Sequence, residues 1–407
     1  MRKSEILVGL DLGTSRVKVV VADLSERGAP EILGAGESVA RGIEAGVVVN
    51  MDMASASIRE AVEAAEDSAD VEIGRVSISI DGEHIKGIDS RGVIAVSRSG
   101  GEITKGEVDT VLEAAKTLAL PVGRAIVDVL PQEFFVDGQR GIRTPIGMSG
   151  VRLGSKVHIV TASQQAVDNV IRAVRKVGLR TDGITLRPLA ASLASVSPDE
   201  KELGTLVVNL GAGTTGLVLY QAGAVRHTAS IGWGASSITN DIAVGLRVPL
   251  SRAEQLKMEH GCALVSAAGD DPIEIPTVGG GPPRESSKQI LAAVIEPRVG
   301  EIFELVANEL KSTEYSNVVP AGVVLTGGGA RLEHVAELAE QFFGTPARVG
   351  LPDRVSGSFD AVADPAYAAA VGTVVATAET SGGGRYRGEM PLAGTVQRVR
   401  QLVDRFL

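Results

Sequence analysis

The sequence Asn209-Leu-Gly-Ala-Gly-Thr-Thr215 lies between the apolar run 205–208 and a second apolar run, 217–220. This order predicts a strand, a tight turn and a second strand. The two glycines let the backbone approach a ligand closely, backbone amides can point inward, and the threonine hydroxyls can donate hydrogen bonds. The turn is therefore suited to binding a phosphate. An ordinary hairpin with a glycine-rich turn is the alternative.

A second copy of this pattern lies near the start of the chain. The apolar run 6–10 leads into Asp11-Leu-Gly-Thr-Ser15 and then into the apolar run 17–22, and both copies continue into a further predicted hairpin. The chain thus contains an internal duplication, and two facing hairpins of this kind can hold a polyphosphate from both sides. A third glycine cluster, Leu325-Thr-Gly-Gly-Gly-Ala330, follows another apolar run and can pack its backbone against a base or sugar.

Composition narrows the class of protein. The 407 residues are enough for two or three domains, and 40 Lys and Arg against 50 Asp and Glu give a net charge of −10, which argues against nucleic acid as a partner. The single cysteine, Cys262, cannot form an internal disulfide and has no paired histidines for zinc. We expect neither a signal peptide nor a membrane-spanning helix, because acidic residues interrupt the first apolar run and no long apolar span follows.

Local patterns predict several further elements. Capping boxes are expected at Thr104 with Glu107, and at Ser251 with Glu254. Two separate strands are expected at 125–129 and 134–136, and a loop at 266–287. Helices are expected at 288–311, kinked or broken near Pro297, at 330–343 and at 364–378; the last is rich in small residues and suited to close packing.

The last twelve residues have a segregated pattern. On a helix, six apolar side chains fill one arc and polar or basic side chains fill the other. The apolar arc consists of Val396, Val399, Leu402, Val403, Phe406 and Leu407. Five arginines against Glu389 and Asp404 make residues 385–407 locally basic. A basic amphipathic helix after a glycine-rich linker indicates binding to an anionic membrane surface, and docking on the protein's own core or on a partner is the alternative.

The order and spacing of the three glycine clusters are those of the superfamily of actin, heat-shock chaperones and sugar kinases. Within it, the chain resembles the FtsA family of bacterial cell-division proteins along nearly its whole length. The segments that carry this resemblance are Leu130-Pro-Gln-Glu-Phe-Phe-Val-Asp137, Pro145-Ile-Gly-Met-Ser-Gly-Val-Arg-Leu153, Val157-His-Ile-Val-Thr161, Asp199-Glu-Lys-Glu-Leu-Gly204 and Val294-Ile-Glu-Pro-Arg298. Further matches are Ile242-Ala243 and the tail.

The resemblance implies an actin-like α/β fold, with two halves around a nucleotide cleft and an FtsA-type inserted subdomain. The first half is expected at 1–82 and 159–204, and the insertion at 83–158. The second half is expected at 205–380, with 235–320 as its smaller subdomain. Residues 381–395 would be a flexible linker and 396–407 an amphipathic membrane-targeting helix.

The motifs and the resemblance together predict an ATP site. Its expected residues are Gly13, Thr14, Ser15, Lys18, Gly211, Ala212, Gly213, Thr214, Thr215, Glu254, Lys257, Gly327, Gly328, Gly329 and Ala330, with Asp11 for Mg²⁺. Glu254 and Lys257 enter because the superfamily uses a Glu-x-x-Lys helix at the ribose and base. A helix cap with a surface ion pair is the alternative for these two residues.

The family implies filaments that tether the tubulin-like division ring to the inner membrane. The chain would act as a peripheral protein on the cytoplasmic face at the division site, binding anionic lipid, the ring protein and other division proteins. Arg284 and Arg298 match basic positions that contact the ring protein, although Arg298 could equally be a solvated charge.

The chain departs from the family pattern at Asn209 and Gly216, where members usually carry aspartate. A neutral Asn209 cannot hold hydrated Mg²⁺ or orient a water as a carboxylate does, so ATP hydrolysis is expected to be weak or absent. No catalytic residue is assigned. The alternative functions are a small-molecule kinase of the same superfamily, for which no second carboxylate base is found, and a pilus-assembly adaptor ATPase.

Overall fold

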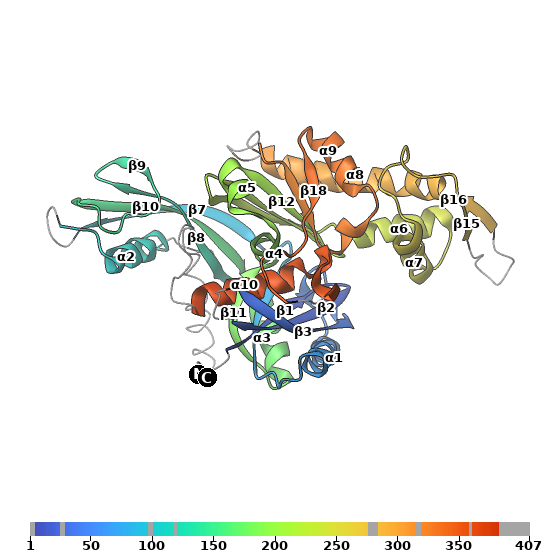
Figure 1. Cartoon of the computed structure of the whole chain (residues 1–407), viewed down its shortest axis with the longest axis horizontal. Coiled ribbons are helices and arrows are strands. Elements are labelled where there is room, and N and C mark those ends of the chain that lie inside the picture. The colour runs from blue at the N-terminus through green and yellow to red at the C-terminus, as the bar shows by residue number, and fades with distance from the viewer. Residues whose placement is uncertain are drawn as a thin grey trace.

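A computed structural model describes residues 5–24, 29–96, 101–117, 120–275, 284–311, 313, 319–357 and 360–381. Two five-stranded sheets form the centres of the two halves, with the strand orders β11-β6-β1-β2-β3 and β14-β13-β12-β17-β18 (Figure 1). In each sheet three strands that follow one another in the chain pair antiparallel. Two later strands are added beside the first of these three, and they pair parallel. The predicted internal duplication is therefore confirmed.

The first sheet consists of β1 (Ile6–Leu12), β2 (Arg16–Leu24), β3 (Pro30–Val39), β6 (Arg75–Ile80) and β11 (Arg180–Leu186). The second consists of β12 (Thr205–Leu210), β13 (Thr215–Gln221), β14 (Ala224–Ile231), β17 (Val323–Thr326) and β18 (Ala347–Val349). Their central strands are buried along almost their whole length, as the continuous apolar runs predict. A short ribbon of β4 (Ile43–Glu44) and β5 (Val47–Val48) leads into α1 (Met51–Ala69). Helices α1 and α3 (Gln164–Lys176) cover one side of the first sheet (Figure 1).

Helix α4 (Arg187–Ser195) lies between the halves, and α10 (Ala368–Ser381) crosses it. All nine residues of α4 are buried, and α4 contacts strands of both sheets. Helix α10 packs on α4 and on β1, confirming the predicted close packing of small residues. A Cβ on Gly372 would lie 1.7 Å from the carbonyl oxygen of Ala190, and one on Gly9 would lie 2.3 Å from that of Ala370. Only glycine at these two positions permits so close an approach.

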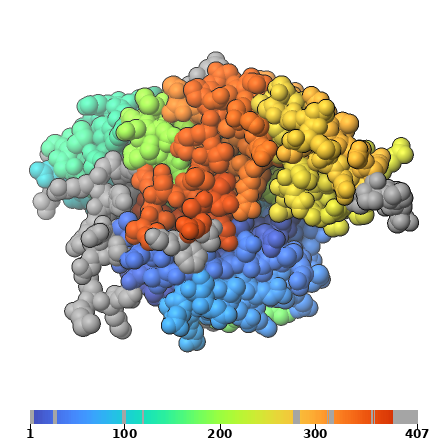
Figure 2. Space-filling model, turned by 45° about the vertical axis from the view of Figure 1, so that its right-hand side comes forward, coloured from blue at the N-terminus to red at the C-terminus, as the bar shows by residue number. Residues whose placement is uncertain are grey.

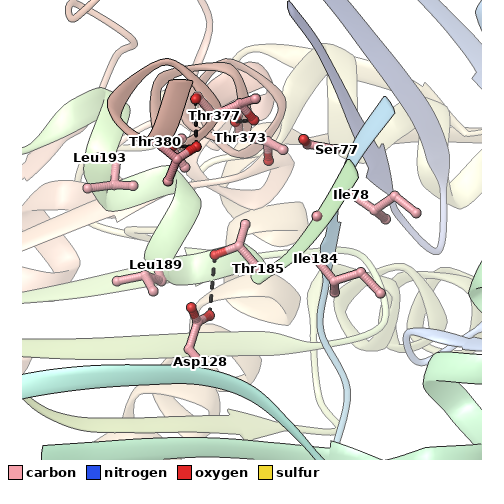
Figure 3. Close-up of a pocket in the computed structure, with 12 residues that line it drawn as sticks. Ser77, Ile78, Asp128, Ile184, Thr185, Leu189, Leu193, Thr373, Thr377 and Thr380 are labelled. Atoms are coloured by element: carbon pink, nitrogen blue, oxygen red, sulfur yellow. Dashed lines mark hydrogen bonds between the residues drawn. The ribbon is translucent and has the colours of Figure 1, made fainter. Parts of the chain in front are cut away.

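A pocket lies beside this crossing, between α10, α4, β6 and β11 (Figure 3). The hydroxyls of Thr373 and Thr377 donate to the helix carbonyls of Ala369 and Thr373, both at 2.8 Å, so α10 offers mainly methyl groups to the pocket. On the opposite wall the carboxylate of Asp128 accepts from the hydroxyl of Thr185 at 3.4 Å. The pocket is thus mostly apolar and separate from the predicted ATP residues.

The inserted part lies at one end of the molecule (Figure 1). Its sheet has the order β7-β10-β8-β9 and is covered by α2 (Lys105–Ala115). The strands are β7 (Lys86–Ala95), β8 (Arg124–Val136), β9 (Gln139–Ile142) and β10 (Arg152–Ser163). The capping box at Thr104 is confirmed, because Thr104 N donates to Glu107 Oε2 at 2.8 Å.

The strand predictions at 125–129 and 134–136 are confirmed, but the two segments belong to one continuous strand, β8. Its pairing with β10 shifts between Lys156 and Val157, so Gln132 is an extra residue in a β-bulge beside Pro131. The bulge accommodates the proline, which has no N–H for the ladder. It also turns Gln132 toward the second half, where its Nε2 donates to Val225 O at 3.1 Å.

A buried histidine joins the insertion to the second half. His158 on β10 lies between the carboxylate of Asp89 on β7, at 2.8 Å from Nδ1, and the hydroxyl of Thr228 on β14, at 2.9 Å from Nε2. The pKa of Asp89 is lowered even though burial raises it, because His158 and Lys156 stabilise the carboxylate. The insertion is therefore anchored to β14 by a buried polar contact.

We expect acid to weaken this junction, first through His227. Burial and the neighbouring His158 lower the pKa of His227, against the opposing effect of Glu309. A histidine with a lowered folded-state pKa stabilises the fold above its unfolded pKa of about 6.5, and this contribution is lost as the pH falls below that value. Urea unfolding between pH 7.5 and about 5 should therefore show falling stability, and His227→Gln should flatten the slope. An unchanged slope in the variant would contradict this role.

The smaller part of the second half contains α6 (Ala235–Leu246), α7 (Leu250–His260) and α8 (Lys288–Lys311). The capping box at Ser251 is wrong, because α7 begins at Leu250 after an N-cap at Pro249, which places Ser251 inside the helix. Helix α8 runs unbroken through Pro297. Residues Ile295 and Val299 are buried on either side of the proline, so packing outweighs its cost of about 3 kcal/mol.

Two further predictions in this half need correction. Residues 266–287 contain the hairpin of β15 (Pro272–Ile275) and β16 (Arg284–Ser287), because Ile273 and Ile275 are buried in the core of the second half. The helix predicted at 330–343 is divided into η1 (Gly328–Arg331) and α9 (Val335–Phe343). His334, at φ +59°, separates the two.

The C-terminal predictions lie almost wholly outside the described residues. Helix α10 follows the turn η3 (Pro365–Tyr367) and extends to Ser381, the first residue of the expected linker. The remaining linker and the amphipathic segment 396–407 are outside the described part of the chain. None of the described helices is both long and apolar enough to cross a membrane.

Candidate functional site

The two glycine-rich turns face each other, and residues 11–15 and 209–215 are called the hairpin junction below. A Cβ on Gly213 would lie 2.7 Å from Thr14 Oγ1, so the two turns are in contact. Each turn is closed by its own backbone: Gly13 N donates to Arg16 O at 3.1 Å, and Gly211 N to Thr214 O at 2.9 Å. In Figure 2 the second half, in yellow and orange, lies directly above the first half, in blue.

Helix α6 begins on the second turn. Ala235 N donates to Gly211 O at 2.9 Å and Ser236 N donates to Ala212 O at 2.8 Å, which fixes the helix N-terminus against the turn. The amides of Ala235, Ser236 and Ser237 thus already have backbone acceptors, and only the helix dipole would favour an anion here. The third glycine cluster also reaches this turn, because a Cβ on Gly329 would lie 2.8 Å from the Cβ of Leu210.

The Glu254 and Lys257 pair lies at the same helix end. Lys257 Nζ donates to Glu254 Oε2 at 2.7 Å and to the carbonyl oxygen of Ala235 at 3.1 Å. Burial lowers the pKa of Lys257, although Glu254 opposes the shift. The pair is therefore partly buried and contacts the start of α6, which a solvated surface pair would not do. The structure brings residues 211–213, 254, 257 and 329 to one place, as the sequence predicts.

The hydroxyl groups of the junction differ in what they contact. Thr215 Oγ1 donates to Trp233 O at 2.7 Å, and Thr214 Oγ1 donates to Asp81 Oδ2 at 2.9 Å. Thr14 Oγ1, in contrast, is buried with no hydrogen-bond partner within the described structure. An unpartnered hydroxyl between two glycine turns fits a phosphate oxygen, since leaving it unbonded costs free energy.

Lys18 is the buried lysine of the first hairpin. It pairs with Asp11 across β1 and β2, and its Nζ lies 5.5 Å from the centre of the Tyr367 ring. Burial lowers its pKa, with Asp11 acting in the opposite direction. A desolvated ammonium group beside the turn suits an anionic ligand. Ser15 is exposed, and Gly328 is exposed on η1.

Three polar residues of the site were missed by the sequence analysis. Ser79 lies near the end of β6, and Asp81 follows that strand. Arg187 directly follows β11. These strand ends lie beside the end of β1, where Asp11 is placed. Ligands in open α/β sheets bind outside the carboxyl ends of the parallel strands. The polar residues that directly follow the apolar runs 76–80 and 183–186 were therefore a usable signal.

One of the two carboxylate oxygens of Asp11, the expected Mg²⁺ ligand, already has hydrogen-bond donors. Asp11 Oδ1 already accepts from Ser79 Oγ at 2.8 Å and from Arg187 Nε at 2.7 Å. Mg²⁺ prefers oxygen ligands in octahedral geometry. Asp81 Oδ1, near Asp11, is a buried oxygen without a hydrogen-bond partner among the described residues. No group of three His, Cys, Asp or Glu suited to a metal occurs among the described residues. The prediction that Asp11 holds Mg²⁺ stays untested.

The two predicted partner residues are both engaged. Arg298 binds Asp241 through Nε and, at 3.1 Å, through Nη2, and its guanidinium lies 4.9 Å from the centre of the Trp233 ring. Arg284 donates to the carbonyl oxygen of Leu246. Arg298 is therefore no solvated charge, and it ties α8 to α6.

Two matching sheets, joined through facing glycine turns and interrupted by an inserted sheet, define an actin-like α/β protein. Solved structures agree: the fold is similar to the PilM-PilN type IV pilus biogenesis complex, with TM-score 0.64, 20% identity, and coverage of 91% of this chain and 97% of that chain. It is also similar to MreB5 of Spiroplasma citri bound to ADP, with TM-score 0.55, 14% identity, and coverage of 93% and 99%.

Sequence comparison specifies the family. The profile described as "Cell division protein FtsA" matches residues 206–372, and that of the "SHS2 domain inserted in FTSA" matches residues 82–161. The protein "Cell division protein FtsA" of Pseudomonas aeruginosa is 39% identical over 413 residues, covering 99% of this chain and 99% of its own length. The chain belongs to the FtsA family of cell-division proteins.

Proposed function

We propose that this protein binds ATP at the hairpin junction and assembles into actin-like filaments that tether the tubulin-like division ring to the inner membrane. The observation that supports nucleotide binding is the contact between the two glycine turns, with the unpartnered hydroxyl of Thr14 between them. The proposed base and ribose contacts are Glu254, Lys257 and residues 327–330, which lie together around the start of α6. The similar fold of MreB5 is described as bound to ADP. Mg²⁺ at Asp11 remains part of this proposal, because only Oδ1 of Asp11 accepts hydrogen bonds from Ser79 and Arg187, and Asp81 Oδ1 beside it is buried without a partner among the described residues.

The tether is the amphipathic segment 396–407, which would lie on the cytoplasmic face of the inner membrane at the division site. Its basic and apolar arcs support binding to anionic lipid. The segment is short, so one copy binds weakly, and a filament that displays many copies binds firmly. The insertion would supply contacts between subunits, because none of the predicted ATP residues lies in it. Filament formation would therefore strengthen membrane binding, which is weak for a single tail.

The ring protein and other division proteins would bind the smaller part of the second half. Arg284 on β16 and Arg298 on α8 remain the proposed contacts. Because Arg298 is paired with Asp241 and Glu301, its contribution to a partner would come through a shared ion pair or through the Trp233 ring beneath it.

ATP binding can be tested at Gly213. A side chain there would lie 2.7 Å from Thr14 Oγ1 and 3.1 Å from the Cα of Ala45, so Gly213→Val must displace the facing turn. We expect calorimetry to show ATP binding by the wild type and a loss of at least about tenfold in the variant.

Gly74→Val is the matched control, because a side chain at Gly74 meets no atom within 4 Å. It should bind ATP like the wild type, and circular dichroism should show both variants folded. Equal ATP affinity in a folded Gly213→Val protein would contradict the site, and absent binding by the wild type would contradict the function.

A further inference from the structure

Asp81 directly follows β6 and carries a buried carboxylate beside the hairpin junction. Its Oδ2 accepts from the hydroxyl of Thr214 at 2.9 Å and lies 3.8 Å from Nη1 of Arg187. Its Oδ1 has no hydrogen-bond partner among the described residues, although Asp81 is 0% exposed. Buried polar atoms in proteins are nearly always hydrogen-bonded, so an orphaned carboxylate oxygen needs an explanation. One oxygen of Asp81 is thus held by protein groups, and the other is left for a ligand.

Asp81 belongs to the first half of the molecule but reaches the second glycine turn. The bond from Thr214 crosses between the halves, and a Cβ on Gly216 would lie 3.0 Å from Asp81 Oδ2. A side chain at position 216 would therefore meet the Asp81 carboxylate. Because both carboxylate oxygens share one carbon atom, the orphaned Oδ1 also lies close to the face between the halves.

The second turn itself offers no carboxylate. Asn209 Nδ2 donates to Thr326 Oγ1 at 3.0 Å, which ties the turn to the strand before the third glycine cluster, and an aspartate could not donate this bond. Gly216 has no side chain. The weak hydrolysis expected from the sequence took only these two positions into account. In the structure a carboxylate from the other half, Asp81, stands beside position 216.

We propose that Asp81 is the general base of an ATP hydrolysis at the hairpin junction. A polyphosphate bound between the two turns would part them and admit water to Oδ1. Oδ1 then accepts a proton from the water whose oxygen bonds to the γ-phosphorus. The bond from that phosphorus to the bridging oxygen breaks, its electron pair leaves with ADP, and the proton passes to the released phosphate.

This inference rests on the proposed ATP site. The alternative is a structural carboxylate that only joins Thr214 of the second half to Arg187 of the first. The two differ in what the loss of Asp81 changes. A general base acts on turnover and leaves ATP affinity nearly unchanged, whereas a carboxylate that holds the turns together affects ATP binding itself.

The test measures ATP binding by calorimetry and phosphate release in excess Mg²⁺, both on the full-length protein. The wild type should bind ATP and release phosphate. Asp81→Asn keeps the size of the side chain and an acceptor for Thr214, but its amide cannot take up a proton. We expect its kcat to fall by at least about 100-fold. Its dissociation constant for ATP should rise by no more than about threefold, so that it retains bound nucleotide as ATP.

Asp128→Asn is the matched control. Asp128 is also a buried aspartate, at 2% exposure, and also accepts from a threonine hydroxyl, that of Thr185. It lines the pocket beside α10, which is separate from the predicted ATP residues. The control should bind and hydrolyse ATP like the wild type.

Three results would overturn the inference and leave ATP binding standing. The first is a wild type that binds ATP but releases no phosphate above the rate without protein. The second is a folded Asp81→Asn protein with kcat within about threefold of the wild type. The third is a loss of ATP affinity of about tenfold or more in this variant. If Asp81→Asn does not fold, Asp81→Ser, whose hydroxyl can still accept from Thr214, replaces it with the same expectations. Absence of ATP binding by the wild type would instead overturn the proposed function, and the general base with it.

Discussion

Replacing Gly372 by alanine should destabilise the protein by at least about 2 kcal/mol, although alanine is the better helix former. The added Cβ would lie 1.7 Å from the carbonyl oxygen of Ala190, and this atom belongs to the backbone of the buried helix α4. Neither helix can shift freely, because α10 is also in contact with β1 at Gly9. The free energy of unfolding in urea measures the effect.

Gly300→Ala is the matched control. Gly300 also lies inside a helix, α8, but a Cβ there meets no atom within 4 Å. The same substitution should therefore stabilise the protein by about 0.5–1 kcal/mol. If alanine lowers the free energy of unfolding at Gly372 but raises it at Gly300, the loss of stability comes from the crossing of α4 and α10. Equal stabilisation at both positions would show that the crossing has room to relax.

Removal of residues 396–407 should abolish binding to anionic vesicles while leaving folding and ATP binding unchanged. Phe406→Glu should have nearly the same effect, because it takes a charge into the boundary of the acyl chains. Arg398→Glu should weaken binding in a manner that depends on salt, through lost attraction to the headgroups. Vesicle co-sedimentation at increasing salt distinguishes the two variants.

Arg59→Glu serves as the control for the charge reversal, since Arg59 is exposed on α1, which covers the first sheet. It should sediment with vesicles like the wild type. If the truncated protein sedimented as well as the full chain, the tail would be a docking helix and the proposed membrane tether would be wrong.

The strands and the two glycine turns could be predicted because the duplicated pattern of apolar runs and glycine turns is local. Each run is buried on both sides in its sheet, so its sequence alone indicates a central strand. The places where prediction was wrong depend on distant contacts. Ile273 and Ile275 form a hairpin strand because they reach the core of the second half, and within 266–287 the short alternation Ile273-Glu274-Ile275 is the local sign of it.

The role of Arg187 could not be predicted for a similar reason. A lone arginine before a proline indicates only a helix start, and its partners, Asp11 and Asp81, are far away in the sequence. Sheet topology brings these groups together, because β1, β6 and β11 are parallel neighbours. Pro131 is comparable: it suggests a break in β8, and a bulge against β10 removes the conflict.

The tight crossing of α4 and α10 has a mechanical consequence. Helix α4 touches strands of both halves, and at Gly372 the backbones of α4 and α10 are in direct contact, so we expect little sliding at this point. We therefore expect the two halves to open at the hairpin junction by a hinge rotation about this crossing. In a hinge rotation, displacements grow with distance from the axis. The two ends of the molecule, at α2 and at the β15–β16 hairpin, would therefore move furthest (Figure 1). A small change at the hairpin junction would thus become a large change at the two ends of the molecule.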